Sequence, residues 1–179
     1  MDLPAHIERA IGNSTKLNVA PYSPGHWETL GPLYEKADIC LIPSELVHQY
    51  PEIGRDRRTD KNAVAARANN DSPDDTLLIV DCYNPLLAEW LAQSADQDEA
   101  LVQGYFAQRR EALRIPLEVG DFFICASERQ RDWLLGQLEA HGRINPQTFG
   151  ADQSLRSLVD VVPYGLPDEE LPPHRAVIK

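Results

Sequence analysis

The chain has 179 residues, of which 42% are hydrophobic and 25% charged, values that fit one globular domain with a full core. Its formal net charge of -11 argues against a nucleic-acid partner, because binding to a phosphate backbone depends on clustered Lys and Arg. No apolar run approaches the roughly 20 residues of a membrane-spanning helix, and the N-terminus lacks the plan of a signal peptide. We therefore expect a cytoplasmic protein without a transmembrane segment.

The first half of the chain predicts two strands that alternate with helices. Strands are expected over residues 17–20 and 37–42, and helices over residues 3–12, 26–36 (interrupted near Gly31-Pro32) and 44–50. Residues 54–75 are polar, rich in Arg and without an apolar stripe, which indicates a flexible loop or insertion.

The second half continues the alternation with longer elements. Strands are expected over residues 76–80, 122–125 and 159–162, helices over residues 85–93, 97–114 and 127–141, and a loop over residues 143–153. About five alternations of strand and helix predict an α/β fold, a three-layer Rossmann-like sandwich with a mostly parallel sheet. Residues 1–167 would form this domain, and the acidic, proline-rich residues 168–179 a linker or tail.

The most informative stretch is residues 120–142, which holds a strand buried on both faces, a turn and an amphipathic helix that stops at Gly142. Ser127 occupies the N-cap position, and Gln130 completes a Ser-x-x-Gln capping box. In open α/β sheets, ligands bind outside the carboxyl ends of the strands, near helix N-termini. Ser127, Glu128 and Arg129 are therefore candidate ligand contacts. The alternative is that Ser127 only caps the helix and the two charges are solvated.

A second group of polar residues follows the strand at residues 76–80. Tyr83 and Asn84 would face the same crevice, although Asn84-Pro85 also suits a simple turn. Asp81 at the strand end is compatible with the phosphoacceptor of a receiver domain, but the acidic pair and the lysine that such a domain also needs are not found in the sequence.

Other chemical signatures are missing from the sequence. There is no glycine-rich dinucleotide fingerprint, P-loop or nucleophile elbow, and the five histidines lack metal-ligand spacing. Cys40, Cys82 and Cys125 have no CxxC spacing and are interpreted as small buried hydrophobic residues. We accordingly predict neither a metal site nor another cofactor.

Two motifs together carry a resemblance to a known family. Residues 125–132 read Cys-Ala-Ser-Glu-Arg-Gln-Arg-Asp, and residues 161–167 read Val-Val-Pro-Tyr-Gly-Leu-Pro. With these motifs the chain resembles the N-terminal domain of bacterial family-four glycosyltransferases, which have two Rossmann-like domains (the GT-B fold). The resemblance runs from about Ala37 to Pro173 and is strongest over residues 120–142. The second motif is usually Val-Pro-Asn-Gly-Val in that family, and Tyr164 replaces its asparagine here.

The resemblance implies an incomplete GT-B N-terminal domain, an acceptor-side part of a retaining transferase that moves a sugar from a nucleotide-sugar donor to an acceptor. The family's donor-binding C-terminal domain and its first strand with a glycine-rich turn are not recognisable. Where many members have a His-Asp pair near the reacting sugar, this chain has Tyr83-Asn84, which can hydrogen-bond a sugar hydroxyl but are poor general bases. The catalytic residues are therefore unknown, and the isolated chain is expected to be inactive.

In a completed enzyme the donor and the acceptor would lie between the two domains, and Pro163, Tyr164 and Gly165 would form the interdomain hinge. The alternative function is a non-catalytic α/β module that binds a partner. An exposed apolar patch near Pro163 to Leu166 would favour completion by another domain or association into a homo-oligomer.

Overall fold

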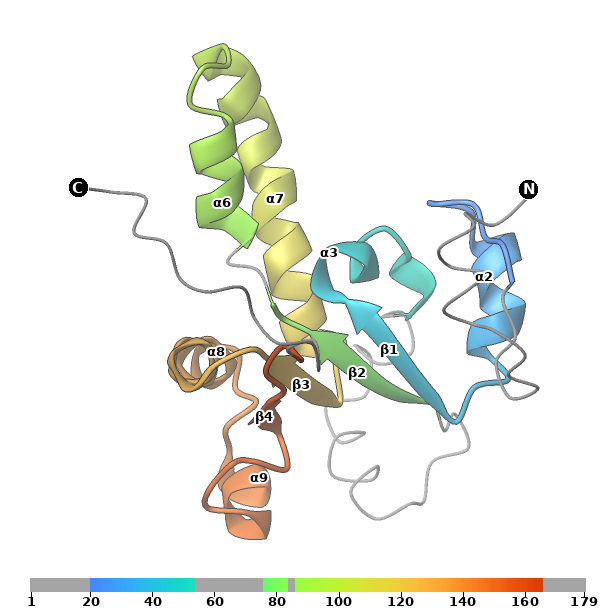
Figure 1. Cartoon of the computed structure of the whole chain (residues 1–179), viewed down its shortest axis with the longest axis vertical. Helices are drawn as coiled ribbons and strands as arrows, with labels where there is room; N and C mark the ends of the chain where they lie inside the picture. The colour runs from blue at the N-terminus through green and yellow to red at the C-terminus, as the bar shows by residue number, and fades with distance from the viewer. Residues whose placement is uncertain (1–19, 54–75, 84–85, 166–179) are drawn as a thin grey trace, which may run out of the picture.

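The computed structural model describes residues 20–53, 76–83 and 86–165 of the chain. Their helices and strands alternate along most of the chain (Figure 1). In chain order these are α2 (Trp27–Tyr34), β1 (Ile39–Pro43), α3 (Ser44–Val47), β2 (Leu77–Asp81), α6 (Leu86–Gln93), α7 (Glu99–Val119), β3 (Phe122–Cys125), α8 (Glu128–Ala140), α9 (Pro146–Ala151) and β4 (Val159–Val161).

The strands form one four-stranded sheet in the order β1-β2-β3-β4, and every neighbouring pair is parallel. Val80 of β2 lies in register with Ile42 of β1 and Phe123 of β3, and Phe123 lies in register with Val159 of β4. A parallel sheet with packed helices is the core of a Rossmann-like α/β fold, so the predicted α/β class with a mostly parallel sheet is confirmed. All the strands point their carboxyl ends toward the same edge.

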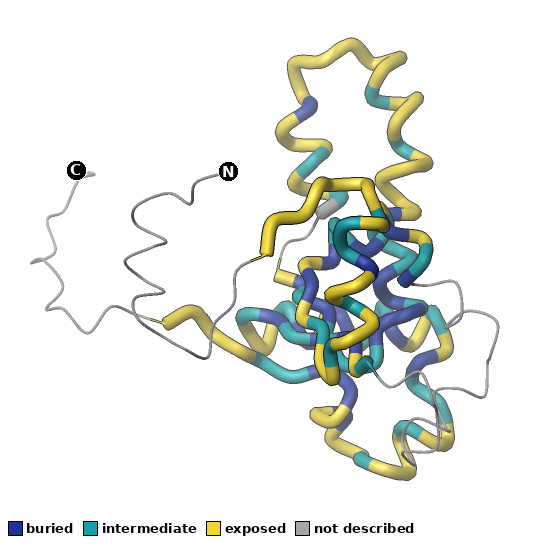
Figure 2. Tube along the Cα trace, turned by 90° about the vertical axis from the view of Figure 1, so that its right-hand side faces the viewer, coloured by how far each residue is buried: buried dark blue, intermediate teal, exposed yellow. Residues whose placement is uncertain are grey.

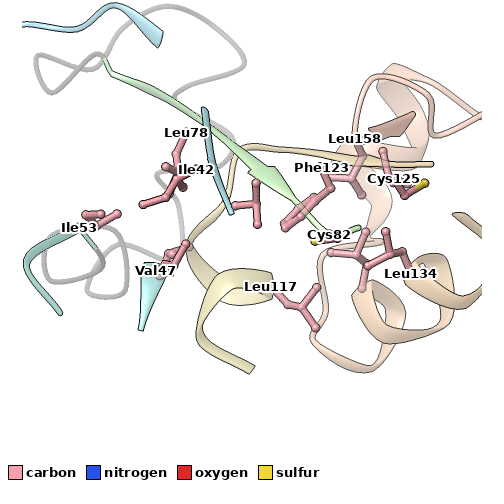
Figure 3. Packing of buried hydrophobic residues seen from close by; sticks show 14 of the residues in the cluster. Ile42, Val47, Ile53, Leu78, Cys82, Leu117, Phe123, Cys125, Leu134 and Leu158 are labelled. Atoms are coloured by element: carbon pink, nitrogen blue, oxygen red, sulfur yellow. The ribbon is translucent and has the colours of Figure 1, made fainter. Parts of the chain in front are cut away.

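One face of the sheet carries the hydrophobic core. Strand residues on this face pack with α3, α7 and α8, which contribute Val47, Leu117 and Leu134 (Figure 3), and α8 also contributes Leu138. A sheet whose strands follow one another in chain order, joined by right-handed crossovers, places its connecting helices on a single face. The sequential strand order therefore explains why these three helices share one core.

The other face of the sheet also carries apolar side chains, and they are more accessible. Ile39 and Leu41 of β1 and Leu77 of β2 are exposed, whereas Phe122 and Ile124 of β3 are half-buried. The prediction that the strand at residues 122–125 is buried on both faces was therefore too strong. Alternate residues of a strand face opposite sides, and only Phe123 and Cys125 lie in the core.

Helix α7 is longer than predicted, because it runs through Pro116 to Val119 and does not end near residue 114. A proline inside a helix removes one hydrogen bond, but Pro116, Leu117 and Val119 are fully buried here, and their packing outweighs that loss. The buried Arg143 supports the helix end, since its Nη1 donates to the carbonyls of Leu117 (2.9 Å) and Glu118 (3.2 Å).

Two further local predictions were wrong. Helix α2 continues through Gly31-Pro32, where a Cβ on residue 31 would lie 2.8 Å from the Trp27 ring, so glycine leaves room for this packing. The predicted loop at residues 143–153 contains helix α9. Asn145 accepts hydrogen bonds from the amides of Gln147 (3.0 Å) and Thr148 (3.1 Å), and Thr148 completes a capping box.

Helices α6 and α7 form a hairpin that projects from the sheet (Figures 1 and 2). Asp98 caps α7 by accepting hydrogen bonds from the amides of Ala100 (2.9 Å) and Leu101 (3.3 Å). Most of the outer part of the hairpin is exposed (Figure 2). No helix of the described residues is both long and apolar enough to cross a membrane.

The predicted helix at residues 3–12, the loop or insertion at 54–75 and the tail at 168–179 lie outside the described residues, as does all but Ala20 of the predicted strand at 17–20. The extent of the domain, 1–167, stays a prediction.

Candidate functional site

The candidate site lies at the carboxyl edge of the sheet, where the segments after β2, β3 and β4 come together. The amide of Cys82 donates to the carbonyl of Ile124 (2.8 Å), and the amide of Val162 donates to the carbonyl of Cys125 (2.7 Å). These bonds extend the parallel ladders past the strand ends. Tyr83, Ser127 and Tyr164, which follow the three strands, are thereby held along one edge.

Gln130 ties two of these segments together. Its Nε2 donates to the backbone carbonyl of Tyr83 (2.7 Å), and its Oε1 accepts from the amide of Ala126 (2.7 Å). Its own amide donates to Ser127 Oγ (3.3 Å), which confirms Ser127 as the N-cap of α8. The predicted capping box is altered, because the Gln130 side chain bonds the amide of Ala126 and reaches across to the β2 segment.

The segments after β2 and β4 meet through two aromatic rings. The ring centroids of Tyr83 and Tyr164 lie 4.6 Å apart in an edge-to-face arrangement. Both side chains remain accessible, with 40% of Tyr83 and 63% of Tyr164 exposed. Partial desolvation of the Tyr164 hydroxyl and its hydrogen bond with Tyr83 raise the pKa of Tyr164 to about 12.

Glu128 and Arg129, the other two candidates on α8, differ in their surroundings. Glu128 Oε1 accepts a hydrogen bond from Arg156 Nη2 at 2.7 Å, and Arg156 also pairs with Asp160 of β4. Glu128 is therefore engaged in a surface ion-pair network beside the helix N-terminus. Arg129 is exposed in the first turn of α8.

The remaining predicted site residues divide into two groups. Asn84 lies outside the described residues. Pro163, Tyr164 and Gly165 follow β4 without regular secondary structure, and Tyr164 makes the contact with Tyr83. Their role as an interdomain hinge stays a prediction.

Arg131 is a structural residue of this region that was not among the candidate residues predicted from the sequence. It is buried, its Nε donates to the carbonyl of Val159 (3.0 Å), and its Nη2 donates to the carbonyl of Ser154. Arg131 precedes Leu134 by three residues and Leu138 by seven, which puts it on the buried side of the helix, and that spacing was the available signal. Arg131 thus fixes β4 against α8.

Two cysteines lie close to the strand ends but are not poised for thiolate chemistry. Burial raises the pKa of Cys82 to about 12, and burial is also the main cause of the raised pKa of Cys125. Within the described residues, no cluster of three or more His, Cys, Asp or Glu side chains is arranged to hold a metal ion. The groups along the edge are suited to hydrogen bonding and to aromatic packing.

Comparisons with protein-family models, with curated proteins and with solved structures found no match to this chain.

Proposed function

We propose that this chain is the acceptor-side, N-terminal part of a glycosyltransferase that moves a sugar from a nucleotide-sugar donor to an acceptor. The observation that carries the proposal is the meeting of Tyr83, Ser127 and Tyr164 along one carboxyl edge of a parallel sheet. That edge is where open α/β folds bind their ligands. The two sequence motifs that resemble the glycosyltransferase family both begin at this edge, one at Cys125 of β3 and the other at Val161 of β4.

The side chains at the edge suit a carbohydrate. Sugars present hydroxyl groups beside apolar C–H faces, and the exposed rings of Tyr83 and Tyr164 offer an apolar surface with hydroxyl groups at its rim. Ser127 adds an exposed hydroxyl whose oxygen already accepts the amide of Gln130. These groups can position a sugar, but none of them is a good general base at neutral pH.

The polypeptide of residues 1–179 is expected not to transfer sugar. In the family that it resembles, the donor is held mainly by the second domain, so this chain would supply one wall of the cleft. The assay is incubation with UDP-glucose, GDP-mannose and ADP-glucose, followed by measurement of released nucleotide. Release above background would overturn the expectation of inactivity.

Binding of simple sugars tests the acceptor-side role itself. Methyl glycosides added to isotopically labelled protein should shift the NMR signals of Tyr83, Ser127 and Tyr164. Shifts confined to the α6–α7 hairpin, or none with any glycoside, would argue against the proposal.

A non-catalytic module that binds a protein partner is the second candidate. It is favoured by the exposure of Val162 and Tyr164, two large side chains directly after the last strand. The NMR spectrum of a protein-binding module would not change when methyl glycosides are added, and this distinguishes the two functions.

A further inference from the structure

The α6–α7 hairpin carries an interaction surface of its own. The outer part of the hairpin projects beyond the sheet and its core (Figures 1 and 2). On α7 it presents Leu101 and Tyr105, which are 57% and 56% exposed, one turn apart on the same side of the helix. Two large apolar side chains at this spacing are typical of a helix face that packs against a partner.

Leu101 and Tyr105 belong to a longer heptad stripe. The stripe runs through residues spaced alternately four and three apart, which are Leu101, Tyr105, Gln108, Ala112, Ile115 and Val119. Its lower half is packed into the body of the protein, since Ala112 and Val119 are buried and Ile115 is half-buried. Its upper half is exposed. The stripe that packs α7 against the core therefore continues along the exposed outer half of the helix.

This stripe is distinct from the side of α7 that faces α6. On that side Arg109 lies 5.5 Å from the centroid of the Trp90 ring, and Val102 and Phe106 are half-buried. The hairpin is thus already closed by its own contacts. Leu101 and Tyr105 lie on a different side of α7 and are available to contact a partner.

Gly104 lies beside the exposed half of the stripe and has open space around it. A Cβ on Gly104 would meet no atom within 4 Å, so packing within the chain gives no reason for a glycine there. Glycine in a helix interior costs about 1 kcal/mol relative to alanine. A residue without a side chain would let another helix approach closely at this point.

The charges along the hairpin indicate what that other helix is. Its tip is acidic, with Asp96, Asp98 and Glu99, whereas Arg109, one turn from Tyr105, lies about 15 Å further along α7. A second hairpin in antiparallel orientation would bring each acidic tip beside the other's Arg109, and a parallel one would set like charges together. Charges further apart than about 8 Å are largely screened at physiological ionic strength, so this local pattern matters more than the net charge of -11.

We propose that two copies of this chain associate through the exposed halves of their α7 helices in antiparallel orientation. Leu101 of one copy would pack against the partner's Tyr105, and the partner's Leu101 against Tyr105. The contact is isologous, so it closes with two copies and forms a dimer. It leaves the carboxyl edge of the sheet free, and it does not depend on the proposed function.

The test is sedimentation equilibrium of the 179-residue chain over a wide concentration range. Wild type should form a dimer, and Leu101→Lys and Tyr105→Asp should each abolish it. Both positions are exposed, so circular dichroism should show unchanged helix content. Leu41→Lys is the matched control, because Leu41 is 61% exposed but lies on the sheet. It should leave the dimer intact.

Orientation is tested by combining the two substitutions in one chain. In the antiparallel arrangement the introduced lysine of each copy faces the introduced aspartate of the other, so the double variant should regain the dimer. A parallel arrangement would set lysine against lysine and would not be rescued. The proposal is overturned by a wild type that is monomeric throughout, by a dimer that survives the single substitutions, by a dimer that Leu41→Lys dissociates, or by a double variant that stays monomeric.

Discussion

The side-chain amide of Gln130 donates to the backbone carbonyl of Tyr83 across 2.7 Å, although 47 residues separate them in the chain. This bond joins the first turn of α8 to the segment after β2. The carboxyl edge of the sheet thereby becomes one continuous surface.

Replacing Gln130 by alanine should destabilise the protein at the carboxyl edge of the sheet. The substitution removes the bonds to Tyr83 and Ala126, and we expect a loss of about 1–2 kcal/mol in the free energy of unfolding, measured by chemical denaturation. Gln103→Ala is the control, because Gln103 is exposed on α7. Equal stabilities for the two variants would show that the Gln130 bridge contributes little.

The pKa of Tyr164 should depend on Tyr83. Loss of the Tyr83 hydroxyl in Tyr83→Phe removes one cause of the raised value, so the pKa of Tyr164 should fall from about 12 toward its ordinary value of 10.0. In wild type the Tyr164 phenolate should form only as the pH approaches 12. Spectrophotometric titration of tyrosine absorbance, with Tyr164→Phe to assign the signal, measures this. A pKa of Tyr164 that is the same in Tyr83→Phe as in wild type would contradict the predicted coupling.

Arg131 should be needed for stability in a way that its neighbour Arg129 is not. Lysine cannot reproduce the two bonds from Nε and Nη2 to the carbonyls of Val159 and Ser154, so Arg131→Lys should cost about 1.5–3 kcal/mol. Arg129→Lys changes an exposed side chain and should be nearly neutral. Thermal and chemical unfolding of both variants would measure the difference, and similar losses in both would be evidence against the buried role of Arg131.

Substitution by alanine should change the free energy of unfolding in opposite directions at two glycines. A Cβ at Gly120 would lie 2.7 Å from Val80 and 2.9 Å from Phe123 in the core, so Gly120→Ala should destabilise the protein by about 1–3 kcal/mol. At Gly136 of α8 there is open space, and Gly136→Ala should stabilise by about 0.5–1 kcal/mol. Chemical denaturation of both variants would measure the change in stability relative to wild type. A tolerated Gly120→Ala would mean that the turn before β3 has more room than the structure gives it.

Strand positions were predictable because their apolar runs are short and rich in strand-forming residues, as in β2 and β3. Helix ends were less predictable, because packing of Pro116 and Val119 extends α7 where local propensity disfavours it. Helix α9 was missed although the sequence carried its signal, an Asn-Pro pair followed by Thr148.

The candidate site was predictable only in part. The rule that parallel strands end at a common edge brought Tyr83 and Ser127 together correctly. It could not anticipate the ring contact between Tyr83 and Tyr164, which depends on side-chain packing between loops far apart in the chain.

The central claim, that the edge bearing Tyr83 and Tyr164 binds the sugar acceptor, is tested most directly by comparing glycoside titrations of variants. Methyl glycosides should perturb the NMR signals around Ser127 in wild type, and Tyr83→Ala and Tyr164→Ala should abolish the effect. Tyr22→Ala should preserve it, because Tyr22 is 44% exposed but lies before α2. Binding that survives in Tyr83→Ala and Tyr164→Ala, or is lost in Tyr22→Ala, would contradict the account.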